Sequence, residues 1–187
     1  MGRWQPEASV RLVQAALTLF SERGYDATTV AEIAERAGLT KRTFFRYFSD
    51  KREVLFAGSD DLRDLLVEAT AAAPASATPI EAVVAGLHAA GPMFAQRHEF
   101  ACLRHAIIAA NPELRERELI KLSSLADSIA AVLRDRGVPE EAAGLAAQTG
   151  MTIFHVAFAR WVDQDDPHGL PRLIDGSLAE LRTLTAA

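Results

Sequence analysis

Apolar residues recur along most of the chain at the three- and four-residue spacing of an amphipathic helix. In the first such stretch, the residues Val10, Val13, Leu17 and Phe20 form one apolar stripe. Signals for strands are nearly absent, because the chain has few β-branched runs, no Asn-Gly hairpin and no sustained alternation of apolar and polar residues. The pattern therefore predicts an all-α protein.

The sharpest helix signals lie in residues 28–51, TTVAEIAERAGLTKRTFFRYFSDK. Thr29 and Glu32 have the spacing of a capping box, and Gly38 can end the helix that they open. Ala34 is small enough to let a second helix cross closely. A small residue at a crossing followed by a turn glycine is typical of a helix-turn-helix.

Thr40 can cap the third helix, in which Phe44 and Phe48 have the spacing of inward residues. Asp50 and Glu53 form a further capping-box pattern, which predicts a long fourth helix. The inward residues of that helix are expected to be Val54, Leu55, Leu62, Leu65 and Leu66.

Breaks later in the chain divide the remainder into several helices. The segment AAAPASATP, residues 71–79, separates the fourth helix from the fifth, and Gly91-Pro92 kinks or divides the fifth. Further helices are expected at 99–110, 112–136, 139–163 and from 171 to the end. We expect about nine helices in two domains: a three-helix domain over 1–50 that carries the helix-turn-helix, and a larger helical domain over 51–187.

The outer face of the third helix has the side-chain chemistry of a surface that binds in the DNA major groove. Arg42 can donate two hydrogen bonds to guanine, and Phe45 can touch a thymine methyl group. Tyr47 and Lys51 are placed to meet phosphate oxygens. The alternative is a charged, solvated face on a small helical bundle. Exposed aromatic residues that have no partner are poorly explained by that alternative, so DNA binding is favoured.

Charge is distributed unevenly along the chain. The net charge is −5, but residues 1–58 carry nine Lys/Arg and seven Asp/Glu, and the remainder carries eleven and eighteen. Positive charge is therefore local, which argues against a protein that coats nucleic acid or membrane along its whole surface. Cys102 is the only cysteine, the N-terminus lacks a signal-peptide pattern, and no uninterrupted apolar run could span a bilayer. We expect a cytoplasmic protein without a membrane partner.

Residues 15–30, 31–48 and the Asp50-Lys51 pair resemble the DNA-binding region of the TetR family of bacterial transcriptional regulators. The resemblance covers about the first 55 residues, and beyond residue 60 it is limited to length and helical layout. It implies a homodimer that binds a palindromic operator, usually as a repressor, and is released by a small molecule bound in the C-terminal domain. By position, it implies DNA contacts from Thr29, Thr40, Lys41, Arg42, Thr43, Phe45, Arg46, Tyr47 and Lys51. The family often has a small residue in place of Arg42 and tyrosine in place of Phe45.

The last two predicted helices are amphipathic. One combines small residues with a bulky end at Ile153, Phe154, Phe158 and Trp161, and the other carries a leucine stripe. Such helices can close the core of one chain or pair with their copies in a homodimer. The homodimer is favoured because one recognition helix reads too few base pairs, and two helices about 34–36 Å apart reach successive major grooves.

A small-molecule site is predicted less sharply. Aromatic and soft side chains of the kind that line adaptable sites are Met93, Phe94, Cys102, His105, Phe154, His155 and Phe158. The alternative interpretation is that these residues are ordinary core. The identity of the effector does not follow from them.

An enzyme is the second class considered. The sequence has no phosphate loop, no motif for a serine or cysteine nucleophile and no carboxylates at metal-binding spacing. The histidines have no spacing typical of a metal site, so we expect no catalytic residue, metal or cofactor. A regulator of the same fold that responds to a protein partner, or that activates transcription, remains open at the level of sequence.

Overall fold

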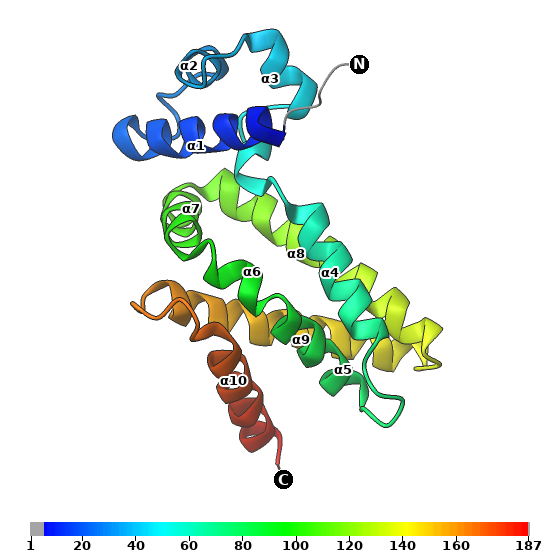
Figure 1. Ribbon diagram of the computed structural model, residues 1–187. Coiled ribbons are helices and arrows are strands. Elements are labelled where there is room, and N and C mark those ends of the chain that lie inside the picture. Colours follow the sequence, from blue (N-terminus) through cyan, green and yellow to red (C-terminus); the bar gives the residue numbers. More distant parts are fainter. Residues whose placement is uncertain (1–5, 187) are drawn as a thin grey trace. The chain divides into compact units, whose positions relative to one another are not determined.

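The computed structural model describes residues 6–186, which contain α-helices, one 3-10 helix and no strand (Figure 1). The all-α prediction is confirmed. The elements are α1 (Pro6–Arg23), α2 (Val30–Arg36), α3 (Lys41–Tyr47), η1 (Glu53–Phe56), α4 (Ser59–Ala71), α5 (Pro79–Ala89), α6 (Gly91–Ala95), α7 (His98–Ala110), α8 (Pro112–Asp135), α9 (Glu140–Val162) and α10 (Leu170–Thr185). Gly91-Pro92 divides the predicted fifth helix into α5 and α6.

The chain forms two compact units. The head unit consists of the chain up to Gly58 together with Leu103–Glu116. The body unit consists of Ser59–Cys102 and the chain from Arg117 onward. The helices α7 and α8 each contribute residues to both units. A domain boundary at residue 50 stays a prediction.

The head unit is built around a small apolar core. Leu12 and Leu19 of α1, Ile33 of α2 and Phe44 of α3 are almost completely buried, and α2 packs against both α1 and α3 (Figure 1). Val10, which we expected in the buried stripe of the first helix, is 52% exposed. The other three residues of the predicted stripe, Val13, Leu17 and Phe20, are buried, and Leu12 and Leu19 widen the buried face of α1.

The predicted long fourth helix is replaced by two shorter elements. Asp50 accepts hydrogen bonds from the backbone N–H groups of Arg52 and Glu53 at 2.8 and 3.2 Å, but this cap opens only the single 3-10 turn of η1. Gly58 then has φ = +83°. That left-handed conformation stops the chain from continuing as a right-handed helix, and α4 begins afresh at Ser59.

The segment 103–116 is held to the rest of the head unit by specific contacts. The Nε of Arg104 donates to the carbonyl of Leu55 at 2.6 Å, and its guanidinium lies 5.1 Å from the ring centre of Phe56. Burial and the neighbouring carboxylate of Glu113 raise the pKa of Tyr25. Side chains that are distant in sequence therefore complete this small unit.

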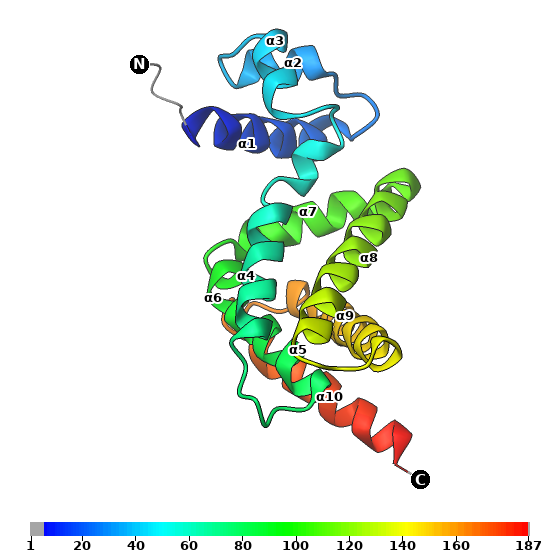
Figure 2. The same ribbon diagram turned by 90° about the vertical axis from the view of Figure 1, so that its right-hand side faces the viewer.

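In the body unit, α5 packs against α4, α9 and α10 (Figure 2). Two of these crossings depend on glycines. A Cβ atom at Gly86 would lie 2.6 Å from the Oγ1 of Thr70 on α4, and one at Gly150 of α9 would lie 2.3 Å from a methyl group of Val83. The absence of a side chain at each glycine lets the helices approach closely, as small residues do at helix crossings.

Helix α9 is long and apolar enough to cross a membrane, judged by length and composition alone. One of its faces is buried in the body unit, through residues such as Ala143, Ala147, Ala157 and Trp161. This burial is the pattern of a core helix in a folded domain, and we interpret α9 in that way.

Candidate nucleic-acid interface

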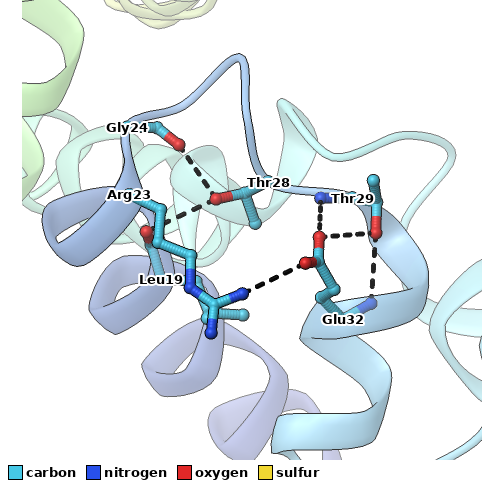
Figure 3. Close-up of polar contacts among 6 residues, drawn as sticks. All are labelled: Leu19, Arg23, Gly24, Thr28, Thr29 and Glu32. Carbon is cyan, nitrogen blue, oxygen red and sulfur yellow. Dashed lines mark hydrogen bonds and ion pairs between the residues drawn. The ribbon is translucent and has the colours of Figure 1, made fainter.

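The start of α2 is fixed by the predicted capping box, which is confirmed (Figure 3). The backbone N–H and the hydroxyl of Thr29 both donate to Oε2 of Glu32 at 2.8 Å, and the hydroxyl accepts from the N–H of Glu32 at 3.3 Å. These hydrogen bonds hold the pKa of Glu32 below its ordinary value. Arg23 adds an ion pair to Glu32 at 3.1 Å. The hydroxyl of Thr29 is therefore used in capping α2.

The turn between α2 and α3 is made by Gly38, as predicted. Its φ of +64° is a left-handed conformation, and the N–H of Leu39 donates back to the carbonyl of Ala34 at 2.8 Å. Arg11 reaches from α1 and donates to the carbonyl of Ala37. A Cβ atom at Gly38 would lie 2.7 Å from the guanidinium of Arg11. Glycine is therefore required here by backbone conformation, because the flexible end of the Arg11 side chain could move aside.

Helix α3 presents a basic and aromatic outer face. Thr40 caps its start by accepting from the N–H of Thr43 at 3.1 Å, and the two hydroxyls lie 2.9 Å apart. With Phe44 fully buried and Phe48 nearly so, the helix is anchored by its inner face. Its outward residues Lys41, Arg42, Phe45 and Arg46 are exposed, while Thr43 and Tyr47 are half-buried.

Two aromatic residues on this helix lie beside cations. Phe45 is 49% exposed, and the ammonium of Lys41 lies 5.9 Å from its ring centre. The guanidinium of Arg46 lies 5.1 Å from the ring centre of Tyr47 and donates to its hydroxyl at 3.3 Å. A large exposed aromatic side chain among cations is typical of a surface that binds DNA, because the cations can meet phosphates and the ring can meet apolar base edges.

The side chains of Lys51 and Arg52, which follow α3, both contact other groups within the head unit. The ammonium of Lys51 lies within hydrogen-bonding distance of three backbone carbonyls. Arg52 pairs with Asp50 at 2.7 Å, and hydrogen bonds from this guanidinium lower the pKa of Asp50. The exposed cations of the outer face are therefore those of α3, and the phosphate contact of Lys51 stays a prediction.

Residues 12–57 match the sequence profile of bacterial regulatory proteins of the tetR family. The regulator TcmR from Streptomyces glaucescens is 37% identical over 73 residues, which are 39% of this chain and 32% of TcmR. The regulator BetI from Cronobacter sakazakii is 29% identical over 178 residues, 92% of this chain and 78% of BetI. At residues 12–57 the chain thus has the sequence pattern of the TetR family of bacterial regulatory proteins.

The fold of the chain agrees with that of solved transcriptional regulators. The transcriptional regulator FadR from Bacillus subtilis, solved in complex with stearoyl-CoA, superposes with a TM-score of 0.61 at 21% identity, over 92% of this chain and 96% of FadR. The match to TcmR spans only about a third of that protein.

The predicted ligand-binding residues are brought together only in part. Phe94, Phe154 and Phe158 form an aromatic cluster with Trp161, with neighbouring ring centres 5.5–6.0 Å apart. The ring of His98 lies 4.5 Å from that of Trp161. We call these five residues the aromatic cluster. Half-buried Met93 lies on α6, next to Phe94 in sequence.

Cys102 lies beside the aromatic cluster, and two predicted residues lie away from it. The thiol of Cys102 donates to the carbonyl of Val162 at 3.4 Å and approaches the ring of His98, and burial raises its pKa. His155 is exposed, because it follows Phe154 on α9 and points to another side of the helix. His105 belongs to the head unit rather than to the body unit.

Sequence reasoning missed several residues that the fold uses. Trp161 was noted only as a bulky residue, although it follows Phe154 and Phe158 at helical spacing. His98 and Arg11 carried no signal, since their partners are distant in sequence. Within residues 6–186, no group of three or more His, Cys, Asp and Glu side chains could hold a metal ion.

Proposed function

We propose that this regulator binds a palindromic operator as a cytoplasmic homodimer, represses transcription and is released by a lipophilic small molecule. The observation that carries the proposal is the outer face of α3, where cations and the 49% exposed ring of Phe45 stand on a helix anchored by Phe44. A capped, anchored helix presents these side chains at fixed positions, which base readout in the major groove requires.

The proposed contacts divide into base-reading and phosphate-binding residues. Arg42 and Phe45 are proposed to meet base edges, because both are exposed near the middle of the helix face. Phosphate contacts are assigned to Thr29, Thr40, Lys41, Thr43, Arg46 and Tyr47. Thr29 and Thr40 stand at helix N-termini, where backbone N–H groups favour an anion.

The homodimer is proposed to form through α9 and α10. Leu145 and Val156 on α9 are 71% and 42% exposed, and Leu184 on α10 is 78% exposed. Large apolar side chains on the outside of two neighbouring helices are the surface that a second copy would cover. Two copies provide the two recognition helices that a palindrome requires.

The effector is proposed to bind at the aromatic cluster. Phe94 and Phe158 are half-buried and so are available at the edge of the body core. The solved FadR complex shows that a protein of this fold holds stearoyl-CoA, and aromatic and soft side chains suit such an apolar chain. Acyl thioesters are therefore the first compounds to test.

The decisive test is selection of bound fragments from genomic DNA with the purified full chain. We expect enrichment of an inverted repeat, and footprinting of both half-sites by a species that sediments as a dimer. The proposal would be contradicted if the selection recovered no preferred sequence. It would also be contradicted if the protein were a monomer at micromolar concentration and still protected the full site.

Replacing Arg42 by alanine is expected to relax the preference at one base position in each half-site. A bidentate contact to guanine contributes about 1–3 kcal/mol of discrimination against the wrong base. The measurement is the base preference from repeated selection, with Arg36→Ala as the control, since Arg36 is an exposed cation of the head unit that pairs with Glu22 at 3.0 Å. An unchanged preference for Arg42→Ala would exclude base readout by this residue.

Replacing Phe158 by alanine is expected to abolish the response to effector while leaving operator binding intact. Long-chain acyl-CoA should raise the melting temperature of the wild-type protein and release its operator, because a ligand that binds only the folded state stabilises it. Thermal shift and fluorescence anisotropy give both readouts. His155→Ala is the control, because His155 is exposed on the same helix and points away from the aromatic cluster. Release of operator from Phe158→Ala at wild-type concentrations would exclude the aromatic cluster as the site.

A further inference from the structure

Lys51 has an environment that a phosphate-binding side chain does not require. Its Nζ donates to the carbonyls of Tyr25, Thr28 and Asp26 at 2.8, 3.1 and 3.4 Å. It also lies 4.1 Å from the ring centre of Tyr25. An ammonium has three N–H donors, so these carbonyls account for all of them, and the aromatic face adds a cation–π contact.

The carbonyls that Lys51 holds belong to the loop that leads into α2. Thr28 is 1% exposed, and its hydroxyl donates to the carbonyl of Gly24 at 2.9 Å (Figure 3). Thr28 directly precedes the N-cap Thr29. The position of Thr28 therefore sets where α2 begins and in which direction it runs.

Lys51 itself follows the end of α3. The helix ends at Tyr47, and the chain is extended at Phe48. The contact between Lys51 and Thr28 thus joins the residue before the first helix of the helix-turn-helix to a residue just after the second. It closes residues 28–51 into a loop that holds both α2 and α3.

The Tyr25 ring extends this contact into the rest of the head unit. Tyr25 is 4% exposed, and its ring packs edge-on against Phe20 of α1 at 5.1 Å. The carboxylate of Glu113 lies near enough to its hydroxyl to raise the pKa of Tyr25. The ammonium of Lys51 therefore lies against a ring that is buried in the core of the head unit.

We propose that Lys51 is a positioning residue for DNA binding, which acts by clamping the two ends of the helix-turn-helix and not by neutralising a phosphate. The inference rests on the proposed function, because it assumes that α3 reads DNA. It replaces the phosphate contact that the sequence had implied for this residue.

The two roles differ in the salt dependence of binding. A lysine that pairs with a phosphate releases a counterion, and each such contact contributes about −0.9 to the slope of log K against log salt concentration. A lysine that donates to the same carbonyls in free and bound protein contributes nothing to this slope. Its loss lowers affinity at every salt concentration by the same factor.

The experiment measures the Kd of the full chain for its selected operator between about 50 and 200 mM salt. Lys51→Met removes the donors and keeps the length of the side chain, and Lys41→Met is the control at an exposed cation of α3. We expect Lys51→Met to weaken binding about tenfold with the wild-type slope, since hydrogen bonds to a charged group are lost. Lys41→Met should instead reduce the magnitude of the slope by about one.

The clamp would be overturned if Lys51→Met reduced the magnitude of the salt-dependence slope as Lys41→Met does. It would also be overturned if Lys51→Met left the affinity for the operator unchanged. If Lys51→Met fails to fold, Lys51→Gln gives the same readout, because its amide can still donate to the loop. For Lys51→Gln the clamp predicts an intermediate affinity at the wild-type slope, and a reduced slope contradicts it. A wild-type protein that binds no DNA would refute the proposed function instead, so the two failures are distinguishable.

Discussion

Replacing Phe44 by alanine is expected to lower the free energy of unfolding of the head unit by about 3–5 kcal/mol. The side chain is fully buried, and its ring contacts that of Phe48 at 5.6 Å. Truncation leaves a cavity between α3 and the rest of the core, because the surrounding buried side chains can relax into it only in part. Amide hydrogen exchange in residues 28–51 measures the loss, and operator binding should disappear with it.

The matched control for Phe44→Ala is the adjacent residue. Phe45→Ala removes the same ring from the exposed side of α3, so the exchange rates should stay near those of the wild type while operator affinity falls. The pair separates folding from recognition at neighbouring positions. Equal protection in both variants would mean that α3 is not anchored through Phe44.

Replacing Gly150 by alanine is expected to destabilise the body unit by about 1–3 kcal/mol, although alanine is the better helix former. The new Cβ would lie 2.3 Å from one methyl group of Val83 and 3.3 Å from its Cβ. Val83 is 1% exposed and β-branched, so it has little freedom to turn away. Helices α5 and α9 must separate to admit the methyl group, and urea unfolding followed by circular dichroism measures the cost.

Gly144→Ala on the same helix provides the control for Gly150→Ala. A Cβ atom at Gly144 meets nothing within 4 Å, so the substitution should stabilise the protein by up to about 1 kcal/mol through helix propensity alone. Adding Val83→Ala to Gly150→Ala should recover part of the loss by making room for the new methyl group. A Gly150→Ala protein as stable as Gly144→Ala would contradict the close crossing.

The local features of the DNA-binding helices could be predicted because their causes are local. The capping box of Thr29, the cap of Thr40 and the turn at Gly38 each depend on residues within a few positions of one another. The inward placement of Phe44 follows from helical spacing alone. Such features survive in any fold that keeps these helices.

Features that depend on distant partners were missed or misplaced. Lys51 looks in sequence like a cation at a helix start, and only the folded loop brings three carbonyls to it. The long fourth helix was wrong because Gly58 adopts a left-handed conformation that the apolar pattern does not reveal. His155 was grouped with Phe154 by residue type, but adjacent residues on a helix point about 100° apart.

The contacts of Arg104 have a consequence for how the protein folds while it is being synthesised. Its bond to Leu55 and the proximity of Glu113 to Tyr25 place residues 103–116 in the same compact unit as the helix-turn-helix. On the ribosome, α1, α2 and α3 emerge well before that segment, and domains fold as units once their residues are present. The nascent DNA-binding helices must therefore wait for the middle of the chain before their packing is complete.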